Sequence, residues 1–163
     1  MNQLNLSRVN AHSPYKLEVE GDSYLFYTDY DILYSVTFDK EEGINYPAYW
    51  FNLTNLSGMN SPRDRKIQYT VICIIEEFFR SNEDVLLYMC DTADNQQSMR
   101  ARLFMRWFES YESKERYITR SAVVVTENQP DYIVLIVERS HPHAELITEL
   151  FDAEIAAFRQ YKP

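Results

Sequence analysis

The stretch that most constrains the fold spans residues 85–108, where an apolar run is followed at once by an amphipathic helical pattern. The apolar run covers residues 85–90, and a short continuous run of this kind predicts a strand that is covered on both faces. The next residues can offer side-chain oxygens to the free N–H groups that open a helix: Asp91, Thr92, Asp94 and Asn95. In open sheets of this kind, ligands tend to bind at the carboxyl ends of strands, so we expect a site at this turn.

The length and composition of the chain predict one folded domain over residues 1–163. Of these residues 45% are hydrophobic and 15% are aromatic, which is too apolar for a disordered chain. A chain of this length can bury roughly 70% of the surface that its unfolded form exposes. The net charge of −9 argues against a nucleic-acid partner, because such binders display clustered positive charge.

Targeting signals and cysteine spacing indicate the compartment. The first residues contain no charged segment followed by an apolar one, and no apolar run approaches the ~20 residues of a membrane helix. Cys73 and Cys90 have neither metal-binding nor redox spacing, so we expect both to behave as small buried side chains. These features predict a cytoplasmic protein that has no membrane contact.

Hydrophobic periodicity predicts the element order ββββ-α-β-α-ββ-α. The strands are expected at about residues 15–20, 23–28, 32–38, 46–54, 85–90, 117–126 and 132–139, and the helices at about 61–80, 95–111 and 143–161. Ser61 is the expected N-cap of the first helix, with Pro62 at its first position. The first four strands favour an antiparallel meander. The predicted class is therefore α+β with a mixed sheet, in which strand 85–90 lies in the interior beside the meander.

The element order from about residue 24 to residue 139 resembles the GNAT superfamily of acyl-CoA-dependent N-acyltransferases, with Asn95 at its strand-to-helix turn. The resemblance implies a phosphate-binding segment at the start of the first helix, where Arg63, Arg65 and Lys66 would hold acetyl-CoA. That superfamily has glycines where this chain has Lys66 and Gln68, and side chains there would obstruct a pyrophosphate. The N-terminal helical segment of the superfamily has no counterpart among the predicted elements.

The whole chain also resembles an uncharacterised family of small bacterial proteins. The resemblance rests on three motifs: a D-x-K/R-I segment at Asp64 to Ile67, a YxCD segment at Tyr88 to Asp91, and R-x-R-L-F-x-x-W-F at Arg100 to Phe108. This second resemblance implies no activity.

Two groups of charged residues are candidates for chemistry, and each has a plainer explanation. Asp91 and Asp94 could form a carboxylate pair for metal or general-base work, or they could cap the helix. Arg102 and Arg106 are four residues apart on the same helix, so they could grip an anionic ligand or form part of a solvated face.

The pair of histidines at His141 and His143 could suggest a metal site. No Cys and no third His stands near them in the sequence, so we expect no metal.

Aromatic residues crowd the N-terminal meander: Tyr24, Phe26, Tyr27, Tyr30, Tyr34, Tyr46, Tyr49, Trp50 and Phe51. Strands favour aromatic residues in any case, so these side chains could simply be core. Alternatively, one sheet face carries an aromatic surface that fits a partner, most simply a second copy in a homodimer. Tyr49 and Trp50 are expected to point to opposite faces, one in the core and the other exposed or in an interface.

The function that the sequence favours is a non-catalytic binding or interaction module of degenerate acyltransferase-like architecture, with no cofactor. No nucleophile–base pattern is present in the sequence, and the glycines of the phosphate-binding segment are missing. The alternative is an N-acyltransferase that uses acetyl-CoA.

Overall fold

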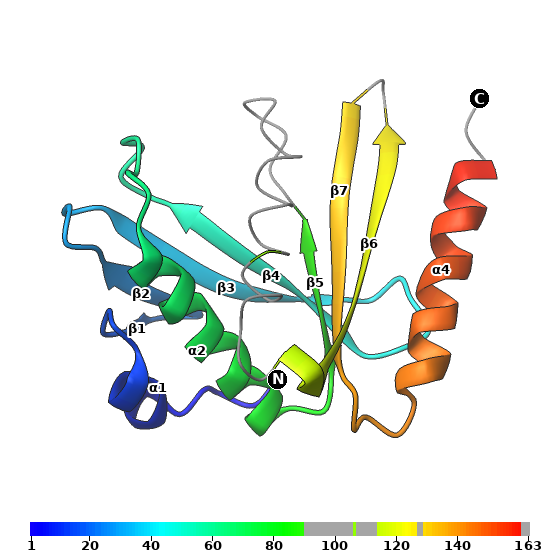
Figure 1. The fold of residues 1–163 in the computed structure, drawn as a ribbon, viewed down its shortest axis with the longest axis horizontal. Coiled ribbons are helices and arrows are strands. Elements are labelled where there is room, and N and C mark those ends of the chain that lie inside the picture. Colours follow the sequence, from blue (N-terminus) through cyan, green and yellow to red (C-terminus); the bar gives the residue numbers. More distant parts are fainter. Residues whose placement is uncertain (90–105, 107–113, 127–128, 161–163) are drawn as a thin grey trace. The chain divides into compact units, whose positions relative to one another are not determined.

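The computed structural model describes residues 1–89, 106, 114–126 and 129–160, and it confirms the α+β class with a mixed sheet (Figure 1). The chain divides into two compact units, and each is built from two separate segments. Unit 1 comprises Met1–Asp39 and Phe51–Glu83, and unit 2 comprises Lys40–Trp50 and Asp84–Pro163. Strand β4 (Ala48–Asn55) begins in unit 2 and ends in unit 1.

The sheet of unit 1 is the predicted antiparallel meander, in the order β1-β2-β3-β4. Its first three strands are β1 (Glu18–Glu20), β2 (Ser23–Tyr27) and β3 (Leu33–Glu41). Gly21 joins β1 to β2 with φ +61, a conformation that glycine adopts without strain. Strand β1 is shorter than predicted, and Val19 is 49% exposed.

Two helices belong to unit 1. Helix α2 (Arg65–Ser81) buries the apolar stripe that its periodicity predicts, and Phe78 stacks on Phe38 of β3 at 5.2 Å between ring centroids. Helix α1 (Leu6–His12) was not among the predicted elements, so the expectation that the chain lacks an N-terminal helix is wrong. Its seven residues are too few for periodicity to reveal, although Asn5 caps it by accepting a hydrogen bond from the Arg8 N–H.

A buried carboxylate ties the N-terminal segment to α2. Glu77 is 1% exposed and pairs with Arg80 at 3.0 Å and Arg8 at 3.5 Å. Its Oε1 also accepts hydrogen bonds from the Ser81 hydroxyl at 3.0 Å and the Asn5 N–H at 3.3 Å. A charge is stable at such a buried position only when its lone pairs are met in this way.

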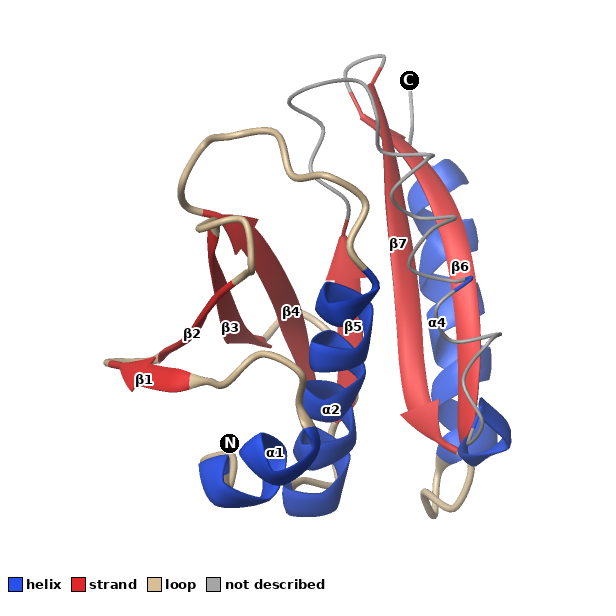
Figure 2. Cartoon of the chain, turned by 60° about the vertical axis from the view of Figure 1, so that its left-hand side comes forward, coloured by secondary structure: helices blue, strands red, loops and turns tan. Residues whose placement is uncertain are grey.

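Unit 2 places its strands in the order β4-β5-β7-β6. Strand β5 (Val85–Met89) lies between β4 and β7 (Gln129–Glu138), as its apolar run predicted, and β6 (Tyr117–Thr126) pairs with β7. The short 3-10 helix η1 (Lys114–Arg116) precedes β6. Helix α4 (Ala144–Gln160) lies along the β6–β7 hairpin (Figure 2). Together they bury a core that includes Tyr46, Ala48, Val85, Leu87, Leu135, Val137, Ile147 and Phe151.

The structure shows which aromatic side chains of the N-terminal meander are buried and which are exposed. Most of them are core: Tyr24, Phe26, Tyr34, Tyr46 and Phe51 are buried. Tyr27 and Tyr30 are exposed. Tyr49 and Trp50 are both half-buried, so the predicted division into one core and one exposed residue is wrong.

The predicted helix over residues 95–111 lies outside the described residues except for Arg106, which is helical and exposed. None of the helices that the structure describes is both long enough and apolar enough to cross a membrane.

Candidate functional site

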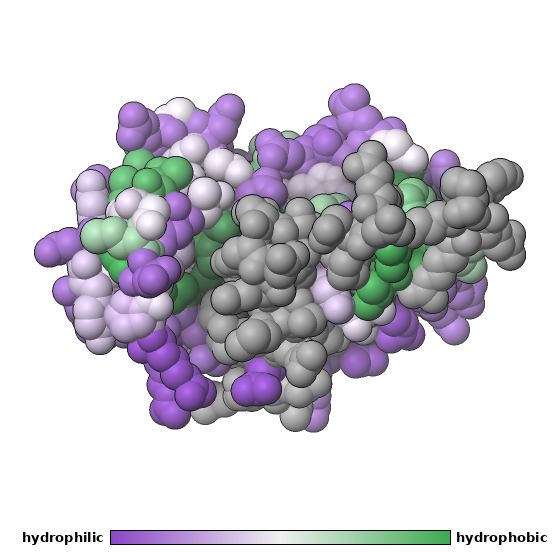
Figure 3. Space-filling model, turned by 90° about the horizontal axis from the view of Figure 1, so that it is seen from above, coloured by the Kyte–Doolittle hydropathy of each residue, from purple (hydrophilic) through white to green (hydrophobic). Residues whose placement is uncertain are grey.

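Four large side chains are exposed at one end of the unit 1 sheet. Tyr27 ends β2 with 63% exposure, and Tyr30 in the β2–β3 turn is 54% exposed. Leu56 at 54% and Met59 at 50% belong to the loop between β4 and α2. Figure 3 looks down on this end of the unit and shows apolar surface there among polar side chains. We name these four residues the apolar cluster.

Strand pairing and one backbone hydrogen bond bring the end of β2 and the end of β4 to the same residue of β3, Leu33. Tyr27 is the register partner of Leu33, and the Leu56 N–H donates to the Leu33 carbonyl at 2.8 Å. Residues directly opposite in an antiparallel pair share a sheet face. The preceding pair, Phe26 and Tyr34, stacks at 5.4 Å on the face that packs against α2. Because successive strand residues alternate, Tyr27 and Leu33 lie on the face away from α2.

Hydrogen bonds fix the backbone of the β2–β3 turn. The Thr28 hydroxyl accepts from the N–H groups of Tyr30 at 3.2 Å and Ile32 at 3.3 Å. Asp31 adopts φ +58, a left-handed conformation that aspartate tolerates better than most residues. The turn therefore presents Tyr30 in one fixed backbone conformation.

The β4–α2 loop is fixed in the same way. The Asn55 side chain accepts from the N–H of Ser57 at 3.0 Å and donates to the carbonyl of Met59 at 2.7 Å. The Ser57 hydroxyl then accepts from the Leu33 N–H at 2.9 Å, which connects this loop to β3. The two loops are thus held together before anything binds to them.

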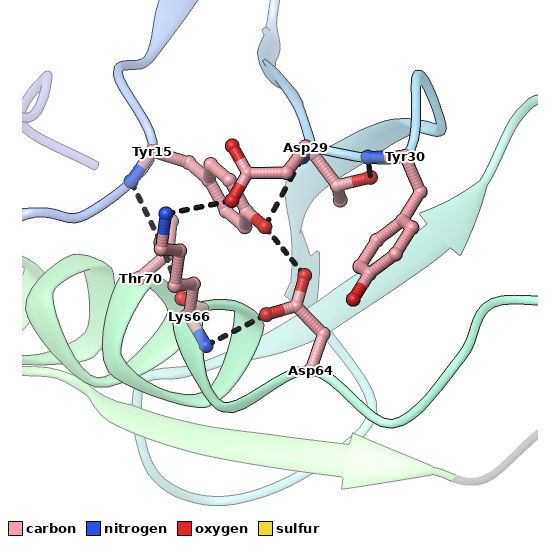
Figure 4. A network of polar contacts seen from close by, with 7 residues as sticks. Tyr15, Asp29, Tyr30, Asp64, Lys66 and Thr70 are labelled. Carbon is pink, nitrogen blue, oxygen red and sulfur yellow. Dashed lines mark hydrogen bonds and ion pairs between the residues drawn. The ribbon is translucent and has the colours of Figure 1, made fainter.

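A polar network beside the apolar cluster connects the β2–β3 turn to the start of α2 (Figure 4). Lys66 Nζ lies 2.6 Å from a carboxylate oxygen of Asp29. The Tyr15 hydroxyl donates to Asp64 at 2.5 Å and accepts from the Asp29 N–H at 3.2 Å. Asp64 also accepts from the Lys66 N–H at 2.9 Å and so caps α2.

The electrostatics of this network favour a structural role. Burial, reinforced by the hydrogen bond to Asp64, raises the pKa of Tyr15 to about 12, so the phenol stays protonated at neutral pH. The hydrogen bond to Asp29 raises the pKa of Lys66, whose ammonium also lies 5.6 Å from the centroid of the Tyr15 ring. Each of these groups is engaged by a neighbour, and the network holds the loops in place.

A second polar group lies in unit 2, around two glutamates. Glu41 accepts from the Trp50 indole N–H at 2.6 Å and from the Gly43 N–H at 2.7 Å, and these bonds lower the pKa of its carboxyl. The Tyr46 hydroxyl lies 3.5 Å from Glu154 of α4, and burial raises the pKa of that carboxyl. The hydrogen bonds anchor the β3–β4 connection and α4, and we assign no ligand to this group.

The predicted phosphate-binding residues lie together at the start of α2, but their contacts differ. Arg63 and Arg65 are exposed, and no residue that the structure describes pairs with them, whereas Lys66 is engaged by Asp29. The N-cap of α2 is Asp64 and not the predicted Ser61. The start of α2 therefore carries a carboxylate of its own where the resemblance places a phosphate.

The other sequence candidates are placed only in part. Asp91, Asp94, Asn95 and Arg102 lie outside the described residues, and Arg106 is exposed. The rings of His141 and His143 are 6.0 Å apart, and His141 Nδ1 accepts from the His143 N–H. Within the described ranges, no three His, Cys, Asp or Glu side chains form a group that could hold a metal.

Sequence reasoning missed most of this site. It did not single out Asp29 or Asp64 as partners, and it treated Leu56 and Met59 only as parts of a loop. The usable signal was turn chemistry: Thr28-Asp29-Tyr30-Asp31 and Asn55-Leu56-Ser57-Gly58 both combine turn-forming residues with a large apolar or aromatic side chain.

Comparison with known proteins identifies a family. No curated protein and no solved structure matches the chain. A family model matches residues 63–153, which begins at the start of α2 and extends into α4. Since this match covers more than half of the chain, the protein belongs to DUF6169, a family of unknown function.

Proposed function

We propose that this protein is a non-catalytic binding module that contacts another protein through the apolar cluster. The observation that carries the proposal is the exposure of half or more of four side chains at the end of β2 and on the two adjoining loops: Tyr27, Tyr30, Leu56 and Met59. Exposed apolar side chains that gather in one place are typical of interaction sites, whereas isolated ones need no explanation.

The fixed backbone of the two loops supports this proposal. Binding is weakened when flexible loops must be ordered, so a preformed loop keeps more of the interaction energy as affinity. Hydrogen bonds to Thr28 and Asn55 already order these loops. Tyrosine is well suited to such a surface because it offers a large area with few rotatable bonds.

The charged side chains around the apolar cluster support an interface more than a reaction. Lys66, Asp29, Asp64 and Tyr15 pair with one another beside Tyr30, at one edge of the apolar cluster (Figure 4). A polar rim around an apolar centre is the usual anatomy of a protein interface.

Chemical cross-linking of the protein to its partner, in the cell from which the protein comes, tests the proposal. A tagged chain that carries Tyr27→Ser together with Leu56→Ser should trap about thirtyfold less partner than the natural chain, equivalent to about 2 kcal/mol. Mass spectrometry of the cross-linked species measures this loss. Urea unfolding should show an unchanged midpoint, because both side chains are mostly exposed.

A matched control is available in the same chain. Tyr69 on α2 and Leu146 on α4 are 51% and 52% exposed, against 63% for Tyr27 and 54% for Leu56. The pair Tyr69→Ser and Leu146→Ser should leave the trapped partner unchanged. Equal losses from the control and the cluster variant would refute the proposal.

A further inference from the structure

We infer that the partner at the apolar cluster is a second copy of this chain, arranged so that the β2–β3 turn of each copy faces the β4–α2 loop of the other. This inference rests on the proposed function and names its partner. The two copies are related by a two-fold axis, so that the acidic turn of each copy lies against the basic loop of the other.

The local charge balance favours a second copy. The chain carries a net charge of −9, which would oppose self-association at most surfaces. Residues 27–33 and 55–66 are an exception, because they contain three acidic residues (Asp29, Asp31 and Asp64) and three basic residues (Arg63, Arg65 and Lys66). The two loops around the apolar cluster therefore sum to zero charge, and like-charge repulsion between two copies is low there.

The charged side chains that have no partner among the described residues carry opposite signs on the two loops. Lys66 is paired with Asp29, and Asp64 is engaged in capping α2. Asp31 is then left on the turn, and Arg63 and Arg65 on the loop. All three are exposed, and the part of the chain that the structure describes offers them no side-chain partner.

A two-fold axis would pair these charges. In such an interface each contact occurs twice, so the acidic turn of one copy can meet the basic loop of the other at both ends. Tyr27, Tyr30, Leu56 and Met59 would then bury the apolar centre between two rims of alternating sign. Complementary rims of this kind select the partner and its orientation.

Charge exchange between two variants tests this geometry. Asp31→Arg makes both charged contacts of its own homodimer repulsive, and Arg63→Asp with Arg65→Asp does the same. Each variant alone should dimerise at least about 100-fold more weakly than the natural chain. In an equimolar mixture every contact is attractive again, so a dimer with one copy of each variant should form within about tenfold of the natural affinity.

Light scattering over a concentration series measures the affinities, and native mass spectrometry identifies the mixed dimer. Asp22→Arg is the control, because it changes the net charge equally but lies in the turn at the other end of β2. It should dimerise like the natural chain. Arginine at Asp31 is strained by the φ of +58, so Asp31→Asn, which tolerates that conformation, should weaken dimerisation several-fold without loss of stability.

The outcomes separate this inference from the proposed function. A purified natural chain that stays monomeric would overturn the inference, while loss of trapped partner in the cluster variant would still support a binding module with another partner. A natural dimer that survives both charge variants, or variants that fail to combine, would overturn the reciprocal arrangement. Equal trapping by the cluster variant and its control would overturn the proposed function itself.

Discussion

Glu77 is buried and Glu154 is half-buried, and the two carboxylates have different surroundings. Glu77 has two arginines, a hydroxyl and a backbone N–H as partners. Glu154 has only the Tyr46 hydroxyl, at 3.5 Å, among the residues that the structure describes. Burial raises the pKa of the Glu154 carboxyl, and the negative charge of Glu41 adds to the effect. The ionised form of Glu154 is therefore unfavourable in the folded protein.

This difference gives a pH-dependent prediction for Glu154→Gln. A carboxyl whose folded pKa lies above its unfolded value binds more protons in the folded state, so stability falls as pH rises through that interval. For Glu154 the interval begins near the unfolded value of 4.5 and extends upward. Glu154→Gln should raise the urea midpoint at pH 7 and leave it unchanged at pH 3.5, which lies below the interval.

Glu149→Gln is the control for that measurement, because Glu149 is exposed on the same helix. Its midpoint should match that of the natural chain at both pH values. A Glu154→Gln variant that is no more stable than this control at pH 7 would contradict the assignment.

At the scale of elements, the start of α2 shows why a cap must be identified from its contacts. Ser61 with Pro62 is a good N-terminal signal, yet the helix begins three residues later than this signal predicts. Asp64 does two things that Ser61 cannot do there: it accepts from the Lys66 N–H and from the Tyr15 hydroxyl. The second bond spans 49 residues of sequence, so no local pattern could reveal it.

Asp64→Ala should therefore destabilise the fold by about 1–2 kcal/mol, because the cap and the Tyr15 acceptor are lost together. Ser61→Ala should change stability by less than about 0.5 kcal/mol, since the Ser61 hydroxyl bonds, within the described ranges, only to the neighbouring Pro62 carbonyl. Urea unfolding of the two variants measures the difference. The reverse order of effects would restore Ser61 as the cap.

Elements with clear periodicity were predicted from the sequence, and those without it were not. The pairs β2 with β3 and β6 with β7 lie close to their predicted ranges because their apolar residues alternate and a turn separates them. Helix α1 was missed because seven residues hold only two turns. The apolar cluster was anticipated only as an aromatic meander, since neither the fixing hydrogen bonds nor the choice of exposed residues is visible locally.

At the scale of the whole molecule, the resemblance to the acyl-CoA-dependent N-acyltransferases predicts an anion site that the chemistry at α2 opposes. Asp64 already supplies a negative charge to the helix start, and Asp29 neutralises Lys66. A pyrophosphate would have to displace both carboxylates or lie beside them. Arg63 and Arg65 are the remaining cations at that position.

We therefore expect no tight binding of acetyl-CoA. Titration calorimetry with acetyl-CoA and with CoA at moderate salt should show no dissociation constant in the low micromolar range, about −8 kcal/mol. Binding of that strength, lost in Arg63→Ala with Arg65→Ala, would instead assign an acyl-CoA site and revive the alternative function.

The division of the chain has a consequence for its synthesis. Unit 1 uses nothing beyond Glu83, although it omits the stretch Lys40–Trp50. Its meander, α1 and α2 can thus assemble on the ribosome while most of unit 2 is still untranslated. Lys40–Trp50 would then form a loop, because the beginning of β4 has no β5 to pair with until the rest of unit 2 has been translated. At that stage the second half of β4 would already pair in the sheet of unit 1, while its first half would still lack β5 as a neighbour.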